Sequence, residues 1–521
     1  MKRRICTAAA LLLALCMLLG GCSQDKESME LRVCLEQAPA TLDPALVTND
    51  SERSLVTHLY DNLMRLSDDG EGGLTATCAA AKSYQVEDNL DGTQTYTFIL
   101  RQDARWSDGR AVTAGDFVYA WQRLADPATG SGDASLLDMV SGYSEARSGQ
   151  DGTLLQVSAP DEHTFVVQLR YRCAYFLTDV CTAAATMPVR SDAAEQEDWS
   201  LSSDTLLTNG AYRVTAWEEG QLTARLAEDY YDARRLGPDT LTFVFESGAS
   251  KREALLKTGE VDFAANLPEG DTIDPYPQST VLLLNQQAQS VESEALRQAL
   301  SLSIDRAALI EGHDYGAAEG LVPHGLRNTM GQDFRTVSGS LINNDPETYE
   351  ARCQQAQELV QSGAHSGQIT LLHEGSESAT TVAKTLQRNW KEQLGITVVL
   401  RAVTAQELKD SVYAGEFMIA LVTLQADRAD ASGLLSLWRG GNSYFYASAY
   451  DMLLRAADAS GQVAVRDAYL EDAERLLVED GWVIPLYDAH RHSALADGLT
   501  GLLYDGCGVY DFRYIRRQTA Q

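Results

Sequence analysis

The chain has 521 residues, of which 45% are hydrophobic and 22% charged. These values are typical of a globular protein too long for one simple core, so about two to four domains are expected. The formal net charge of −32 argues against nucleic acid as a partner, because phosphate backbones are bound by clusters of lysine and arginine.

The N-terminus has the pattern of a secretory signal: Lys2, Arg3 and Arg4 precede an apolar run from Ile5 to Leu19. This run is too short to span a bilayer comfortably, and no later stretch is apolar enough to do so. The following Leu19-Gly20-Gly21-Cys22 resembles the bacterial lipobox. We therefore expect a signal peptide over 1–21, a lipidated Cys22 and a tether over 22–30. An ordinary secretory signal with a chance cysteine is the alternative.

Six cysteines remain beyond Cys22, and an exported chain permits disulfides between them. Spacing cannot give their connectivity, so buried thiols and one or two bridges are both open. The six are Cys34, Cys78, Cys173, Cys181, Cys353 and Cys507.

The first elements in chain order are a short strand near residue 31 and a helix over 52–66. The helix is predicted because Leu55, Leu59, Leu63 and Leu66 fall near one helical face. A half-buried strand follows over 93–101, where tyrosine, phenylalanine and leucine alternate with polar residues.

The stretch RWSDGRAVTAGDFVYAWQRLADP (105–127) is predicted to be scaffold, although its aspartates could suggest a catalytic loop. Its Asp-Gly step is typical of a tight turn, and Thr113 with Asp116 has the spacing of a helix capping box. A regular apolar stripe follows, and Asp126-Pro127 ends the helix. Each carboxylate thus has a structural role, and no apolar enclosure that would raise its pKa is evident.

The second half is predicted to be α/β, because helix–glycine–strand units recur in it. A single helix is expected over 293–312, ending at Gly312. Further units are expected over 381–403 and 466–487.

Enzyme motifs of useful specificity are lacking. The stretch GSESA (375–379) has Glu377 where a nucleophile elbow needs serine. His490 and His492 could bind a metal, but no third ligand lies nearby in sequence, and an exposed strand end is the better interpretation. No cofactor is expected.

Several blocks, in order along the chain, resemble the family 5 extracellular solute-binding proteins, the oligopeptide- and dipeptide-binding lipoproteins of ABC importers. The most specific block is WSDG followed by TAGDF within residues 100–130. The other blocks are PATLDP (39–44), LYDNL (59–63), TNGAYRVTAW (208–217), YYD (230–232), LRQALSLSIDR (296–306), VPHG (322–325), WKEQLGI (390–396), YD (450–451) and IPLY (484–487).

The resemblance implies an α/β, two-lobed periplasmic-binding-protein-like fold (type II) with an extra inserted domain, three domains in all. Lobe I is expected from 31–57, 189–285 and 498–521, the extra domain from 58–188 and lobe II from 286–497. Such proteins enclose an extended peptide by adding it to a strand edge between the lobes, and the hinge then closes.

The resemblance also implies ligand contacts. Asp427 matches an aspartate that pairs with the α-ammonium of a peptide, and Thr423, Leu424 and Gln425 would offer backbone groups. Thr48, Asn49 and Asp50 would do so from lobe I, and Asn285 matches an asparagine between the lobes. The resemblance places Leu421 where relatives have arginine, Leu424 where they have tryptophan and Ala405 where they have a second aromatic residue, so the pocket is expected to be less basic and less aromatic.

The sequence therefore predicts a non-enzymatic monomer, lipid-anchored outside the cytoplasm, that passes short peptides to an ABC permease. The alternative on the same scaffold is an oligosaccharide or a nickel or other metal chelate as ligand. A secreted hydrolase is a remote alternative, because a catalytic triad is a spatial arrangement that sequence does not reveal.

Overall fold

The computed structural model describes residues 28–71, 73–196, 198–312, 315–362, 368–426 and 428–518. Within them an 11-stranded mixed sheet has the order β15-β14-β16-β12-β17-β11-β1-β10-β9-β8, with β13 beside β17. Its strands are β1 (Glu30–Leu35), β8 (Tyr212–Glu218), β9 (Gln221–Leu226), β10 (Thr240–Phe245), β11 (Phe263–Leu267), β12 (Thr272–Leu284), β13 (Tyr315–Ala317), β14 (Ile369–Glu374), β15 (Val398–Val403), β16 (Ile419–Gln425) and β17 (Val483–Leu495).

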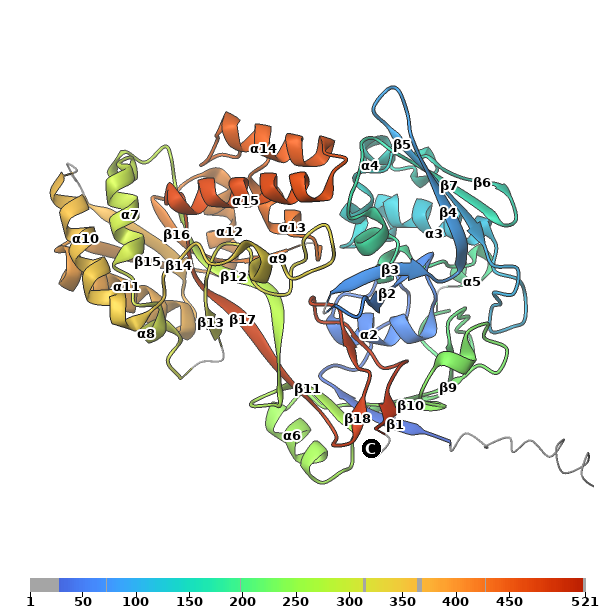
Figure 1. The fold of residues 1–521 in the computed structure, drawn as a ribbon. Helices are drawn as coiled ribbons and strands as arrows, with labels where there is room; N and C mark the ends of the chain where they lie inside the picture. Colours follow the sequence, from blue (N-terminus) through green and yellow to red (C-terminus); the bar gives the residue numbers. More distant parts are fainter. Residues whose placement is uncertain are drawn as a thin grey trace, which may run out of the picture.

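The molecule has two lobes that share this sheet (Figure 1). We use lobe I for the part built on β11, β1, β10, β9 and β8, and lobe II for the part built on β14, β15 and β16. The strands β12 and β17 cross from one lobe to the other, and their register slips between Pro275 and Ser279. These two strands are the hinge. The predicted α/β class is confirmed.

The extra domain is a four-stranded antiparallel sheet, β4-β5-β7-β6, with one long helix and several short ones. Its hydrophobic core continues into lobe I, because Phe98, Trp121 and Leu31 belong to one buried cluster. Lobe I and the extra domain therefore pack as one body.

The domain boundaries predicted above stay a proposal. The elements are β4 (Ala81–Asp88), β5 (Gln94–Leu100), β6 (Val157–Asp161), β7 (Thr164–Leu169), α3 (Ala114–Ala125) and α4 (Tyr143–Gly149), with the hairpin β2 (Met64–Asp68) and β3 (Leu74–Cys78) beside them.

The stretch 105–127 is scaffold, as predicted. Helix α3 begins with the Thr113–Asp116 capping box and ends at Asp126. The Asp116 carboxylate accepts hydrogen bonds from the Trp106 indole N–H, at 3.1 Å, and from the Thr113 N–H, at 2.8 Å. Burial raises the pKa of Asp116, an enclosure that the sequence did not reveal. The carboxylate fastens the turn to the helix.

Lobe II is a three-layer structure, with helices on both faces of its part of the sheet. One face packs α7, α8 and α11, and the other packs α13, α14 and α15. Its helices are α7 (Glu294–Leu302), α8 (Arg306–Ile310), α9 (Phe334–Ser338), α10 (Tyr349–Ser362), α11 (Glu377–Leu394), α12 (Ala405–Ala414), α13 (Ser432–Leu435), α14 (Ser448–Ala459) and α15 (Val463–Glu479). Lobe I carries α2 (Asp50–Leu59), α5 (Ser191–Ala194) and α6 (Ala249–Lys257).

The helix predicted over 52–66 is wrong in its second half, because α2 ends at Leu59 and β2 begins at Met64. Side chains hold the chain in a turn between them. The Asn209 amide bonds both the N–H of Asp61, at 3.1 Å, and its C=O, at 2.9 Å. These bonds come from a residue 148 positions away, and they hold the backbone of Asp61 in a non-helical turn.

The single helix predicted over 293–312 is also wrong, because it is two helices, α7 and α8. The Ser303 hydroxyl donates back to the Ala299 C=O at 2.9 Å, and Asp305 caps α8 by accepting from the Ala308 N–H at 3.1 Å. Gly312 has a φ of +76°, which suits a residue that follows a helix.

The six cysteines from Cys34 to Cys507 are all free thiols in the structure. Cys22 and the predicted signal peptide lie outside the described residues. Within the described part of the chain, every helix is too short or too polar to cross a bilayer.

Candidate functional site

The main site feature is a strand edge in lobe II that lacks a partner. Strand β16 pairs with β12 along its whole length, from Ile419 to Gln425. On its other side β14 pairs only with Ile419 and Ala420. Among the described residues no strand pairs with the second edge of β16 from Leu421 to Gln425. Unpaired N–H and C=O groups along an edge are a template for an added strand.

A slot of about 1150 Å³ lies along this edge. Its walls come from β16, β12 and β17, from the start of α11, from one side of α12 and from the loop over 437–444. This volume exceeds the range that small-molecule pockets usually have, roughly 300–1,000 Å³. The slot is therefore large enough for an extended, multi-unit ligand.

The predicted contacts in lobe II lie at this edge. Thr423 and Leu424 line the slot, and the Thr423 hydroxyl is 3.0 Å from that of Thr280 on β12. Gln425 is exposed and accepts a hydrogen bond from the Gln278 amide at 3.0 Å. Asp427 lies outside the described residues, so its role stays a prediction.

The predicted contacts in lobe I have local roles at the start of α2. Asn49 caps the helix by accepting from the Glu52 N–H at 3.0 Å, and the Thr48 N–H donates to the Glu52 carboxylate at 2.8 Å. Asp50 accepts from Arg491 on β17 at 2.5 Å and from the Tyr276 hydroxyl on β12 at 3.2 Å. Asp50 thus ties lobe I to the hinge strands. Ligand contacts by these residues stay predictions.

Asn285 is buried at the end of β12 that lies farthest into lobe II. Its side-chain N–H groups donate to the C=O groups of Gly415 and Phe417, both at 2.9 Å. Its oxygen accepts from the Gln287 N–H at 2.8 Å. The amide therefore joins backbone segments of lobe II, and its contact with a ligand stays a prediction.

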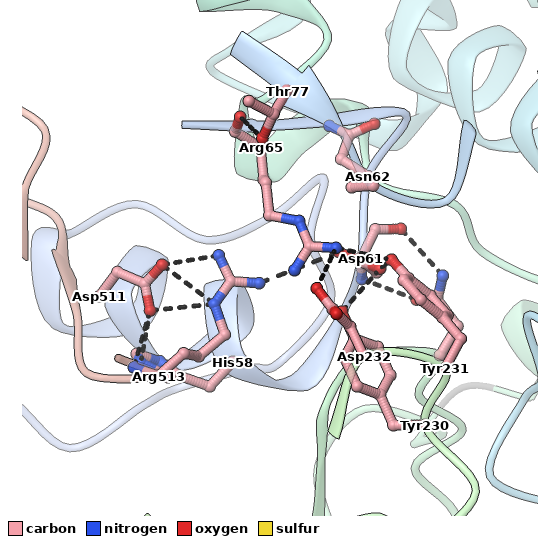
Figure 2. A network of polar contacts seen from close by, with 12 residues as sticks. His58, Asp61, Asn62, Arg65, Thr77, Tyr230, Tyr231, Asp232, Asp511 and Arg513 are labelled. Atoms are coloured by element: carbon pink, nitrogen blue, oxygen red, sulfur yellow. Dashed lines mark hydrogen bonds and ion pairs between the residues drawn. The ribbon is translucent and has the colours of Figure 1, made fainter. Parts of the chain in front are cut away.

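A second cavity of about 430 Å³ lies where lobe I, the extra domain and lobe II meet. Its floor is a polar network that sequence reasoning missed (Figure 2). Arg513 is held by Asp511 at 2.7 Å, and Arg65 bonds the Tyr231 hydroxyl at 3.2 Å. Tyr231 in turn donates to Asp61. The charges are paired within the protein, so this floor is structural.

The wall of this cavity joins the extra domain to lobe II. Asp179 of the extra domain pairs with Arg327 of lobe II at 3.0 Å, and it also accepts from the Asp430 N–H at 2.7 Å. Asp430 forms a bidentate pair with Arg466, at 2.8 and 2.9 Å. The four side chains are almost fully buried. No motif in the sequence indicated this contact.

Two further carboxyl groups near the hinge have raised pKa values. Burial raises the pKa of Asp505, beside Arg327, to about 6. Burial also raises the pKa of Asp488, on β17, to about 7. The described residues contain no group of three or more His, Cys, Asp or Glu that could hold a metal ion.

Two lobes joined by hinge strands, with a free strand edge beside a large slot, define a ligand-binding receptor. The chain belongs to the bacterial extracellular solute-binding proteins, family 5, whose model matches residues 76–446. Members are substrate-binding proteins of ABC importers that work outside the cytoplasm and carry no catalysis. This membership confirms the predicted family, and it argues against the alternative prediction of a secreted hydrolase.

Relatives match over most of their length. The chain is 25% identical to the dipeptide-binding protein DppE of Bacillus subtilis, covering 92% of this chain and 90% of that one. It is 24% identical to the oligopeptide-binding protein OppA of the same species, covering 95% and 93%.

Solved structures of the murein tripeptide-binding protein MppA are similar to this chain over almost its whole length. The unliganded open form has a TM-score of 0.81 at 25% identity, covering 94% of this chain and 98% of that one. A second structure, of the Escherichia coli protein, has a TM-score of 0.67 at 25% identity, covering 95% and 99%.

Proposed function

We propose that the protein is a lipid-anchored receptor that binds short peptides between its lobes and delivers them to the permease of an ABC importer. Relatives named for dipeptides and oligopeptides support the ligand class. The N-terminal pattern ending at Cys22 supports the anchor. In this proposal the receptor acts as a monomer.

The free edge of β16 is the observation that carries the peptide proposal. A peptide in extended form repeats an N–H and a C=O at each residue, and it can satisfy the unpaired groups from Leu421 to Gln425. Oligosaccharides and metal chelates have no such repeat. Closure of the hinge then brings lobe I onto the bound strand.

Asp427 anchors the peptide's α-ammonium in this proposal. It follows the end of β16 by two residues, next to Ala426, whose N–H donates to Pro277 C=O at 3.0 Å. In this proposal its carboxylate supplies the negative charge that pairs with the ammonium group. A charge-assisted hydrogen bond to the ammonium fixes the direction of the peptide.

Native mass spectrometry of the soluble chain from Ser23 tests the proposal. We expect peptide masses on the protein as purified, their loss after unfolding and refolding, and recapture from a mixed peptide library. Asp427→Asn weakens the recapture, whereas Asp472→Asn, exposed on α15, leaves it unchanged. Recapture of sugars or a nickel chelate in place of peptides would overturn the proposal.

A further inference from the structure

The slot beside β16 has two chemically different sides, because successive residues of a strand point to opposite faces. Val422 and Leu424 pack against the cluster that contains Trp438 and Tyr444. Thr423 points to the other face, where it meets Thr280. We call these two sides the apolar wall and the hydroxyl wall.

The apolar wall includes side chains that are only half covered. Helix α12 has no buried residue among its ten, although it carries Leu408 and Val412 one turn apart. Both line the slot, and both pack only partly against the core. Leu437, also in the lining, is 46% exposed. A bulky apolar side chain in the slot would cover this surface and gain the free energy of its burial.

The hydroxyl wall consists mainly of alcohol and phenol side chains, and these can bond small polar groups. Tyr315 and Tyr487 stack there with ring centroids 4.6 Å apart. Strand pairing places Thr280, Thr423 and Tyr487 on this face, with Tyr315 stacked on Tyr487 and Leu421 beside them. Ser376 and Ser378 also line the slot. Among the described residues that line the slot, only Glu374 and Lys409 carry a formal charge, so charged ligand side chains would find few partners along these walls.

We infer that the receptor selects peptides in which bulky apolar and small polar side chains alternate. The inference rests on the proposed function, because it takes the ligand to be a strand on the β16 edge. Alternate side chains of that strand face the apolar wall and the hydroxyl wall in turn. The free edge from Leu421 to Gln425 spans about 17 Å, which pairs with roughly five ligand residues.

Three tetrapeptides of identical composition test the order of side chains: Leu-Ser-Leu-Ser, Ser-Leu-Ser-Leu and Leu-Leu-Ser-Ser. Their dissociation constants are measured by calorimetry on refolded, ligand-free protein. We expect one of the alternating peptides to bind at least about tenfold more tightly than the blocked peptide, because only it places both leucines on the apolar wall.

Leu424→Ser, on the apolar wall, removes most of this preference, whereas Leu90→Ser, on a fully exposed hairpin far from the slot, retains it. Sequencing of peptides captured from a random tetrapeptide library is a second readout that needs no variant. It shows apolar residues enriched at every second position.

Equal binding of the three peptides, or library capture without a two-residue period, overturns the inference and leaves the proposed function standing. Capture of library peptides with no binding of any of the three also overturns it. If neither the three peptides nor any library peptide binds, the proposed function itself fails.

Discussion

Asp179 in the extra domain and Arg327 in lobe II form a buried ion pair, with Oδ1 3.0 Å from Nη2. The other oxygen of Asp179 accepts from the Asp430 N–H at 2.7 Å, and Arg327 also donates to the Asp505 C=O at 2.8 Å. The extra domain and lobe II therefore touch directly in this structure. The hinge strands are not their sole connection.

Asp179→Ala leaves the Arg327 guanidinium and the Asp430 N–H buried without this partner. Breaking a buried pair in this way costs about 3–5 kcal/mol. We expect a lower free energy of unfolding in urea and a larger radius of gyration by small-angle X-ray scattering. Asp103→Ala, on an exposed loop of the extra domain, should change neither. Unchanged values for Asp179→Ala would mean that the contact does not hold the bodies together.

Gly331 forms a second part of the same contact. Its φ is +84°, and a Cβ there would lie 1.9 Å from the Leu74 C=O of β3. Gly339 has a similar φ of +73° with open space around its Cβ position. Gly339 has a ψ of −176°, which places its backbone in a region essentially restricted to glycine, so Gly339→Ala should cost about 1–3 kcal/mol from backbone strain alone. Gly331→Ala should cost more and speed amide hydrogen exchange in β3, and equal effects of the two changes would contradict the contact.

His58 makes the stability of lobe I depend on pH. Its Nδ1–H donates to the Ser54 C=O at 2.6 Å, and its Nε2 accepts from the Phe512 N–H at 2.9 Å, so the ring is neutral. Burial lowers the pKa of His58 to about 4. As the pH falls, His58 is protonated in the unfolded state before it is protonated in the folded state. Its contribution to the free energy of unfolding is therefore full above about pH 6.5 and is lost as the pH falls to about 4.

The size of this loss is about 3 kcal/mol. We expect urea unfolding of His58→Gln to give a weaker stability at pH 7 but a smaller decrease between pH 6.5 and 4 than the unsubstituted chain. A decrease of the same size in both proteins would show that another group is responsible.

Asp488 has the opposite dependence on pH. Burial raises its pKa to about 7, with Ser279, Arg335, His324 and Glu474 around it. The folded state keeps its proton longer than the unfolded state does, so its contribution is full below about pH 4 and is lost as the pH rises through about 7. The change in the free energy of unfolding caused by Asp488→Asn should be about 2–4 kcal/mol more favourable at pH 8 than at pH 4. A pH-independent effect would contradict the raised pKa.

Local signals in the sequence predicted the local structure well. The capping box at Thr113 and the proline after Asp126 gave the bounds of α3, and the alternation over 93–101 gave β5. The prediction failed where distant side chains interrupt a periodic pattern. Asn209 ends α2 from another part of the chain, and no periodicity in residues 52–66 contains that information.

The site was predictable only in part. The resemblance led to Thr423, Leu424 and Gln425, which lie at the edge of β16. It could not give the length of the free edge, because that depends on where β14 diverges. Nor could it give the Asp179–Arg327 pair, whose members are 148 positions apart. Aspartate and arginine are common on any protein surface, so residue type alone does not indicate which of them form a buried ion pair.

The unpaired edge of β16 also bears on solubility. An open strand edge can join the sheet of another molecule, which leads to aggregation. Here the start of α11 and one side of α12 line the recess along this edge. Because these helices cover its flank, the sheet of another molecule can approach the edge less freely than a single extended chain can. The walls that shape the binding slot therefore also limit self-association of the receptor.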